Sequence, residues 1–277
     1  MPVLALTGST GHVGGRAARL LGPAVSRLIV RDAARAPRLD GAPEIAVADY
    51  DDEAAARAAL AGVDVLLMVS AAESEHRRDS HRRFITAAAE AGVRHIVYTS
   101  FDGAAPDATF TLGRDHWDAE QAIRETGMAF TFLRDNFYSD FYPLFADEQG
   151  VIRGPAGEGR AAAVARADVA DVAAVVLADP AAHEGGIYHL TGPEPLSFDG
   201  AAARMTVALG RPFRFVDQTL EEAYESRRVF TDEQWQLDAW VSTYTAIADG
   251  TLDRVTDDVE RLTGHPARTI EQALLGD

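Results

Sequence analysis

The chain has 277 residues, 47% of them hydrophobic, with a formal net charge of −17 and no cysteine. This length and composition are typical of a globular protein with one large domain or two coupled ones. The acidic charge argues against nucleic acid or an anionic membrane surface as a partner, and the absence of cysteine excludes disulfides and a thiol nucleophile.

All 26 basic residues are arginine, and lysine is absent. The hydrophobic runs have the length of β-strands and are too short to span a membrane. The chain begins directly on an apolar strand, so no signal segment is expected. We therefore expect a cytoplasmic protein, monomeric or homodimeric, whose partner is a small molecule.

The N-terminal segment predicts a strand, a glycine-rich turn and a helix. The apolar residues 2–6 form the strand, the turn has the spacing Gly8-x-x-Gly11-x-x-Gly14, and an amphipathic helix opens around Val13. Such a turn directs backbone N–H groups and the positive end of a helix at a phosphate. We interpret it as a dinucleotide-binding motif, although a hairpin or plain loop can carry similar glycines.

A second strand is predicted at residues 27–30, and Arg31 and Asp32 follow it directly. At this position an acidic residue favours a free ribose 2′-hydroxyl, whereas an arginine favours a 2′-phosphate. Because Arg31 comes first and Arg35 and Arg38 are close behind, we favour NADPH over NADH. A solvated basic loop is the alternative.

Three further strands end in polar residues. Residues 44–48 lead to Asp49, which could accept a hydrogen bond from the adenine amino group. Residues 63–69 lead to Ser70, and residues 95–99 lead to Ser100. Since ligands of open α/β sheets bind outside the carboxyl ends of the strands, these residues are expected to lie over the cofactor.

Helices are predicted at residues 54–60, 74–91 and 115–126, followed by a sixth strand at 130–133. In the second of these helices His76 and His81 lie among arginines, and a solvated helix face is a better interpretation than a metal site. The alternation predicts an α/β fold, with a Rossmann-type doubly wound parallel sheet over residues 1–134. No metal is expected.

Residues 135–277 read as a smaller, mainly helical substrate-binding or cap region, with a strand near 187–191 that returns to the main sheet. A helix with a wide apolar face begins near Trp235 and includes Trp240. We interpret this face as core or cap packing, and contact of one tryptophan with the substrate is the alternative.

Several helix starts are marked by capping residues in this second region. The predicted N-caps are Ser197, Thr219, Thr231 and Thr269. Thr219-x-x-Glu222 and Thr231-x-x-Gln234 have the spacing of capping boxes, in which two side chains satisfy free backbone N–H groups reciprocally.

Longer motifs connect these elements to a known family. They are TGSTGHVG at residues 7–14, YTSFD at 98–102, LRDNFYS at 133–139 and RADVADVAA at 166–174. With them the chain resembles the NmrA-like, atypical branch of the short-chain dehydrogenase/reductase superfamily, and within it bacterial NAD(P)H:quinone oxidoreductases. The resemblance covers nearly the whole chain and is weakest around residues 220–250.

The resemblance implies an oxidoreductase that uses NADPH, with NADH possible, and reduces a quinone or a similar electrophilic small molecule. The residues expected to bind the cofactor are Gly8, Ser9, Thr10, Gly11, His12, Val13, Gly14, Arg31, Asp49, Ser70, Ser100 and Phe101. The residues expected to bind the substrate are Phe101, Asn136, Phe137 and Tyr138, with His116 beside them.

The chemistry above the cofactor cannot be the usual one of the superfamily. A Tyr-x-x-x-Lys pair is excluded by the absence of lysine, and we interpret Tyr98, inside a strand, as structural. Reduction of a quinone needs mainly alignment and a hydrogen bond to the developing phenolate. The candidates for this catalytic role are His116, Asn136 and Tyr138, although His116 could also be a surface residue at a helix start.

Two other functions fit the same features. Some NmrA-like proteins are non-catalytic sensors that bind NADP and a partner protein, and the missing lysine is compatible with that role. A tailoring reductase of secondary metabolism would keep the chemistry and change the substrate.

Overall fold

The computed structural model describes residues 2–276, which fall into two compact units. The first unit comprises the chain up to Ser100, Asp115–Arg134 and Val169–Tyr188. The second comprises Phe101–Arg114, Asp135–Asp168 and the chain from His189 onward. Each unit is thus built from three segments of sequence, and one crossing between them falls directly after Arg134.

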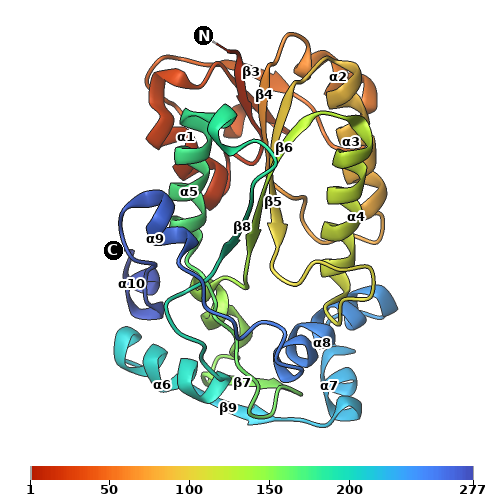
Figure 1. Ribbon diagram of the computed structural model, residues 1–277. Helices are drawn as coiled ribbons and strands as arrows, with labels where there is room; N and C mark the ends of the chain where they lie inside the picture. Colours follow the sequence, from red (N-terminus) through yellow and green to blue (C-terminus); the bar gives the residue numbers. More distant parts are fainter. Residues whose placement is uncertain (1, 277) are drawn as a thin grey trace. The chain divides into compact units, whose positions relative to one another are not determined.

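A seven-stranded sheet in the order β3-β2-β1-β4-β5-β6-β8 forms the centre of the first unit (Figure 1). Its strands are β1 (Leu4–Leu6), β2 (Arg27–Val30), β3 (Glu44–Val47), β4 (Val65–Met68), β5 (His95–Phe101), β6 (Ala129–Asp135) and β8 (Ile187–Leu190). Neighbouring strands from β3 to β5 pair in parallel, with Ala5 opposite Arg27 and Val65 opposite His95. The strand order reverses between β1 and β4, where dinucleotides bind in folds of this kind.

Helices lie on both faces of this sheet. They are α1 (His12–Leu21), α2 (Glu53–Leu60), α3 (Arg77–Glu90), α4 (Thr111–Thr126) and α5 (Arg166–Ala178), with short 3-10 turns η1 (Gly22–Ala24), η2 (Ala33–Arg35) and η4 (Pro180–His183). Figure 1 shows α1 and α5 on one face and α3 and α4 on the other. The predicted Rossmann-type doubly wound fold is confirmed.

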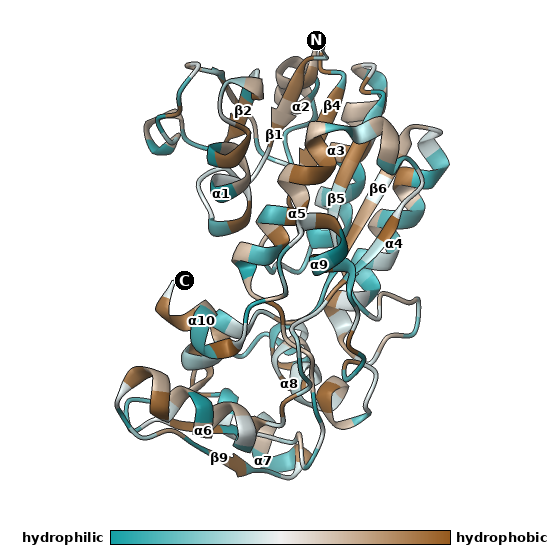
Figure 2. Ribbon diagram, turned by 60° about the vertical axis from the view of Figure 1, so that its left-hand side comes forward, coloured by the Kyte–Doolittle hydropathy of each residue, from teal (hydrophilic) through white to brown (hydrophobic). Residues whose placement is uncertain are grey.

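The core of the first unit explains why the strands are so apolar. Every residue of β4 and β5 is buried, as expected for parallel strands that helices cover on both faces. Figure 2 shows β2 and β4 coloured as hydrophobic. Leu66, Met68, Phe84 and Ile96 are fully buried in one cluster, and each such side chain stabilises the fold by about 1.5–3 kcal/mol.

The second unit is mainly helical, as predicted. It contains the two parallel strands β7 (Val151–Gly154) and β9 (Arg214–Asp217), the 3-10 segment η3 (Ser139–Phe145), and the helices α6 (Phe198–Leu209), α7 (Leu220–Arg227), α8 (Gln234–Ala248), α9 (Asp258–Thr263) and α10 (Ile270–Leu275). On α8, Leu237, Val241 and Tyr244 are buried, whereas Trp235 and Trp240 are half-buried.

Most of the predicted N-caps are present. The Ser197 side chain accepts a hydrogen bond from the Gly200 N–H at the start of α6, and Thr219 and Thr269 form complete capping boxes on α7 and α10. The capping box predicted at Thr231 is wrong: α8 begins at Gln234 with Glu233 as N-cap and no side-chain cap. Thr231 instead accepts from the Glu233 N–H in the turn before the helix.

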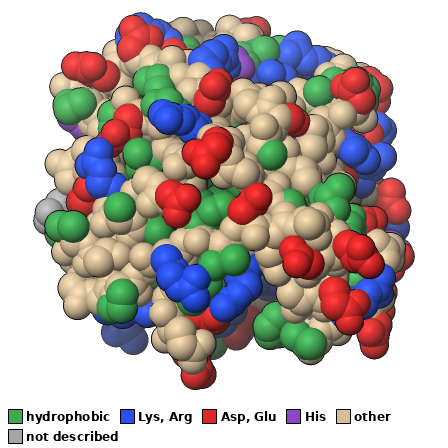
Figure 3. Space-filling model, turned by 90° about the horizontal axis from the view of Figure 1, so that it is seen from below, with side chains coloured by type: hydrophobic (Ala, Val, Ile, Leu, Met, Phe, Trp, Pro, Cys, Tyr) green, Lys and Arg blue, Asp and Glu red, His purple; other side chains and the backbone are tan. Residues whose placement is uncertain are grey.

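Among the described residues no helix has both the length and the apolar composition needed to cross a bilayer. Figure 3 shows acidic, basic and hydrophobic side chains interspersed over the face that it presents.

Candidate active site

The glycine-rich turn links β1 to α1. Gly8 has a φ of +66°, and a Cβ there would lie 2.7 Å from the Cβ of Val69. A Cβ on Gly14 would lie 2.6 Å from the carbonyl group of Gly8. The turn is closed by a hydrogen bond of 2.9 Å from the Gly11 N–H to the Gly8 carbonyl. Glycine is therefore required at positions 8 and 14 by close approach of the backbone to its neighbours.

Polar groups at this turn lack partners in the protein. No side chain caps α1 at Gly11, so the first N–H groups of this ten-residue helix are free of a capping group. Ser9 is 2% exposed, and its Oγ has no hydrogen-bond partner among residues 2–276. Thr10 and His12 are exposed beside it, and Val13 is buried. An unpaired buried hydroxyl and an uncapped positive helix end fit a phosphate group.

The arginines that follow β2 are exposed and available. Asp32 accepts a hydrogen bond of 2.9 Å from the Ala34 N–H and thereby caps η2. Within the described part of the chain, the guanidinium groups of Arg31, Arg35 and Arg38 form no hydrogen bond or ion pair, and all three residues are exposed. Three unpaired guanidinium groups in an acidic protein suit a phosphate; the contact of Arg31 with a 2′-phosphate stays a prediction.

Two of the other expected cofactor residues lie at strand ends of the first unit. Asp49 is exposed after β3, and its Oδ1 accepts from the Asp51 N–H at 3.1 Å. Ser70 is half-buried after β4, and its backbone N–H donates to the Thr99 Oγ1 at 2.8 Å. The bond to Thr99 uses the backbone of Ser70 and leaves its hydroxyl without a protein partner.

Ser100 lies on β5 with its hydroxyl already engaged. The Oγ donates to the Oε1 of Glu120 at 2.6 Å, and both residues are fully buried. Arg134 forms a bidentate ion pair with the same carboxylate at 2.8 and 2.6 Å. This contact of Ser100 with α4 could not be inferred from its place at a strand end, because the partner lies twenty residues further along the chain.

His116 is buried on α4, so the interpretation of this residue as a surface position is wrong. Its Nε2 lies 3.0 Å from the Nη2 of Arg77, and its Nδ1 lies 3.0 Å from the Tyr98 hydroxyl. Since arginine can only donate, Nε2 accepts and Nδ1 carries the proton of the neutral ring. Burial, and then the charge of Arg77, hold the pKa of His116 well below its ordinary value, which favours this neutral form.

The other two catalytic candidates belong to the second unit. Asn136 is 1% exposed, its Nδ2 donates to the Leu252 carbonyl at 3.0 Å, and its Oδ1 accepts from the Phe137 N–H at 2.8 Å. The Tyr138 hydroxyl donates to the Oδ2 of Asp135 at 2.9 Å. Burial and the negative charge of Asp135 raise the pKa of Tyr138 well above its ordinary range. Both side chains are thus fixed by hydrogen bonds, and their catalytic roles stay predictions.

Aromatic rings gather around the expected substrate residues of the second unit. Phe101 lies 4.9 Å from Phe110 and 5.1 Å from Phe137, measured between ring centroids, and Phe110 and Phe137 are also 5.1 Å apart. Phe101 and Phe110 are buried, whereas Phe137 is half-buried. The ring planes are inclined to one another by 51°, 55° and 74°, so the three side chains form an interlocked apolar cluster.

Two residues on α3, Arg77 and His81, are buried although their sequence predicted an exposed helix face. Arg77 is 3% exposed and His81 is fully buried, so the predicted solvated face is wrong for His81. The signal was present in the spacing, because Arg77, His81, Phe84 and Ile85 share one helix face. The charged residue types concealed it, since arginine and histidine at such spacing are usually solvated.

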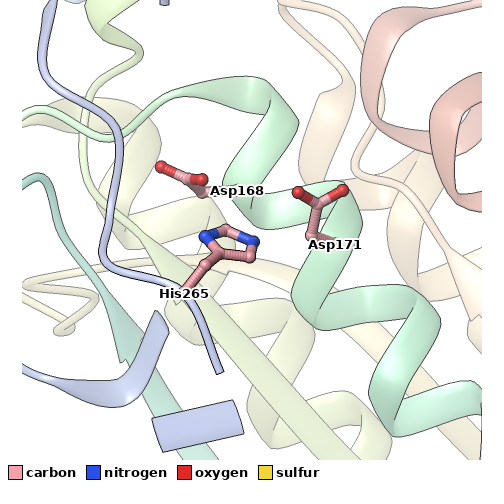
Figure 4. Close-up of side chains that lie close together, drawn as sticks. All are labelled: Asp168, Asp171 and His265. Atoms are coloured by element: carbon pink, nitrogen blue, oxygen red, sulfur yellow. The ribbon is translucent and has the colours of Figure 1, made fainter. Parts of the chain in front are cut away.

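Two carboxylates near the start of α5, Asp168 and Asp171, are shown with His265 in Figure 4. In the second unit an oxygen of Asp168 and a ring nitrogen of His265 lie within 4.8 Å. Asp168 accepts hydrogen bonds from the backbone and the guanidinium of Arg268. In the first unit Asp171 accepts from Arg16 at 2.6 and 3.1 Å. Each of the two carboxylates is thus engaged by an arginine, which is typical of a structural ion pair.

Similarity to known proteins identifies the family to which this chain belongs. A family model described as NAD(P)H-binding matches residues 8–180. The NAD(P)H azoreductase of Xenophilus azovorans is 34% identical over 276 residues, covering 98% of this chain and 96% of that protein. Quinone oxidoreductase 2 of Escherichia coli (strain K12) is 32% identical over 281 residues, covering 98% and 97%.

Solved structures agree with these relatives. The crystal structure of the NADPH-dependent quinone oxidoreductase of Escherichia coli with NADPH superposes with a TM-score of 0.88 at 32% identity, covering 99% of each chain. The resemblance to the NmrA-like oxidoreductases is confirmed. The chain belongs to the NAD(P)H-binding family, whose model matches more than half of it, and is an NAD(P)H-dependent oxidoreductase.

Proposed function

We propose that this protein transfers hydride from NADPH to a quinone or to a similarly electrophilic aromatic compound. Relatives named for azo and quinone reduction, 34% and 32% identical over nearly the whole chain, support this substrate class. Binding of the NADPH phosphates is supported by the buried, unpaired Oγ of Ser9 beside the uncapped start of α1.

The residues around the glycine turn would hold the pyrophosphate. Backbone N–H groups at the start of α1 and the Ser9 hydroxyl would donate to its oxygens. Arg31 would bind the 2′-phosphate of the adenosine ribose in a bidentate fork, with Arg35 and Arg38 adding positive charge. NADPH is favoured over NADH because only NADPH carries this phosphate.

Bound NADPH supplies a hydride, so that a quinone takes up one hydride and one proton and leaves as the hydroquinone, with NADP⁺ as the other product. The cluster of Phe101, Phe110 and Phe137 would supply apolar contacts to an aromatic substrate and help to exclude water from it. The Tyr138 hydroxyl is protonated at neutral pH and donates to Asp135, so it would have to rotate away from this carboxylate to donate to developing negative charge on a substrate.

A substrate panel tests the proposal. NADPH oxidation is followed with benzoquinones, naphthoquinones and azo dyes, and NADPH affinity is measured separately by titration. We expect turnover with at least one class and a preference for NADPH over NADH. Tight NADPH binding without turnover of any compound would contradict the proposed reductase activity and favour a role as a cofactor-binding sensor.

A further inference from the structure

The backbone that follows β4, residues 69–71, is held by side chains from several segments of the first unit. We call these residues the β4 loop. The Val69 N–H donates to the Thr7 Oγ1 at 2.9 Å, and the Tyr50 hydroxyl donates to the Val69 carbonyl at 2.6 Å. The Ser70 N–H donates to the Thr99 Oγ1 at 2.8 Å. Side chains, instead of a neighbouring strand, therefore determine the path of this loop.

The backbone N–H and carbonyl of Ala71 both form hydrogen bonds with side chains of α3. The Ala71 N–H donates to the His81 Nε2 at 2.9 Å, and the Arg77 Nε donates to the Ala71 carbonyl, also at 2.9 Å. Arg77 and His81 are four residues apart, so both project from the same face of the helix. One turn of α3 thus bonds both polar groups of a single residue in the β4 loop.

The bond from Ala71 fixes the protonation state of His81. A backbone N–H can only donate, so Nε2 must be the unprotonated nitrogen and the proton must lie on Nδ1. Burial, and then the charge of Arg77, hold the pKa of His81 well below its ordinary value. The ring therefore remains neutral and keeps its acceptor near neutral pH.

Arg77 is itself held in place. Its Nη2 donates to the His116 Nε2 at 3.0 Å, and the His116 Nδ1 bonds the Tyr98 hydroxyl. Asp115 provides the opposite charge 3.6 Å from its Nη1. A charged side chain that is 3% exposed needs such partners, since an unpaired buried charge is strongly destabilising.

The β4 loop adjoins the glycine turn. Thr7, which bonds Val69, directly precedes Gly8, and a Cβ on Gly8 would collide with the Val69 side chain. Ser70 lies between the bonded residues, and its hydroxyl forms no hydrogen bond within residues 2–276. Its hydroxyl therefore remains available at the carboxyl end of a central strand, where dinucleotides bind in folds of this type.

We propose that Arg77 and His81 are positioning residues for the cofactor, which fix the β4 loop so that Ser70 meets the nicotinamide half of NADPH. This inference rests on the proposed use of NADPH. The two residues act through the Ala71 peptide, and His116 acts through Arg77. A loop ordered before binding loses less conformational freedom when the ligand arrives, so the benefit appears as affinity for that half of the ligand.

A comparison of two ligands separates this role from a general effect on folding. In the proposed complex NADPH would contact both the glycine turn and the β4 loop, whereas adenosine 2′,5′-bisphosphate contains no nicotinamide half. We expect His81→Leu to raise the Kd for NADPH about tenfold and to leave the Kd for the bisphosphate within about twofold. His81→Gln, whose amide oxygen can replace Nε2 as acceptor, should restore most of the affinity for NADPH.

Thr99→Val provides a second variant that leaves the imidazole intact. It conserves the side-chain shape and removes the acceptor of the Ser70 N–H. It should therefore raise the Kd for NADPH and leave the Kd for the bisphosphate nearly unchanged, as His81→Leu does. Unchanged NADPH affinity in both His81→Leu and Thr99→Val would overturn the proposal, as would an equal loss for NADPH and the bisphosphate. A wild-type protein that binds NADPH no better than the bisphosphate would contradict the proposed cofactor itself.

Discussion

At the start of α1, Ser9 carries a buried hydroxyl that no described residue bonds. A hydroxyl of this kind contributes nothing to the free protein, so Ser9→Ala should leave the melting temperature of the apo protein unchanged or slightly raised. If the hydroxyl donates to a phosphate, the same variant should raise the Kd for NADPH roughly tenfold or more. A lower melting temperature with unchanged NADPH affinity would instead make Ser9 structural.

Arg31 is an exposed cation without a partner among residues 2–276, so its removal should affect only the ligand. Loss of a charge-assisted contact of about 1.5–3 kcal/mol would raise the Kd for NADPH roughly 10- to 100-fold in Arg31→Ala. Affinity for NADH should change little. Arg214→Ala removes one exposed positive charge from β9 and serves as the matched control. Equal effects of the two variants would reduce the role of Arg31 to bulk charge.

Tyr138 bonds Asp135 in the free protein, so its catalytic role needs a test that separates chemistry from structure. Tyr138→Phe conserves the ring and removes the donor. We expect kcat for quinone reduction to fall about 10²-fold, in the range seen when one donor to a developing oxyanion is lost. The Kd for NADPH should stay constant. Unchanged kcat would remove Tyr138 from the mechanism.

At the scale of helices and strands, the sequence predicted features that depend on neighbouring residues and did not predict contacts between distant ones. The glycine spacing and the alternation of apolar segments predicted the β1–α1 turn and the doubly wound sheet, because both depend on neighbouring residues. The partners of Ser100, His116 and His81 lie at least ten residues away and required the folded backbone. The sequence predicted that these side chains face solvent, cofactor or substrate, whereas in the structure they are buried and bonded to other parts of the chain.

Helix starts show the same limit at shorter range. Thr219 and Thr231 both precede a residue suited to a capping box, yet only Thr219 forms one. The chain before α8 closes a turn at Thr231 first, so the spacing alone could not distinguish the two.

This difference predicts unequal effects on stability. Thr219→Ala should lower the free energy of unfolding by about 1 kcal/mol, because the first turn of α7 loses its cap. Thr231→Ala, the matched control, should cost less, since no helix N–H depends on it. Chemical denaturation of the two variants measures both values. A larger loss in Thr231→Ala would contradict the assigned start of α8.

For the whole molecule, buried histidines link stability to pH. Burial holds the pKa values of His81 and His116 well below the ordinary 6.5, with the charge of Arg77 adding to the effect, and burial also lowers the pKa of His95. Below about pH 6.5 the unfolded chain therefore binds protons that the folded chain does not. The free energy of unfolding should fall on acidification, by at most about 1.4 kcal/mol per pH unit for each such histidine.

The contribution of one histidine can be isolated by substitution. His81→Gln should show a shallower loss of stability between pH 6.5 and the folded-state pKa than the wild-type protein. Burial raises the pKa values of Asp115 and Asp168, which opposes the loss on acidification, but these residues are common to both proteins and cancel in the comparison. Thermal unfolding across this pH range measures the difference. Parallel curves would contradict a neutral, buried His81.

NADPH held at the glycine turn is expected to reduce a quinone directly. Anaerobic mixing of a preformed protein–NADPH complex with a naphthoquinone, in a single turnover, tests it most directly. We predict that NADPH is oxidised and hydroquinone is formed in equal amounts, and that Arg31→Ala loses this reaction at limiting NADPH. A complex that binds NADPH tightly and leaves it unoxidised by every quinone and azo compound offered would contradict the account.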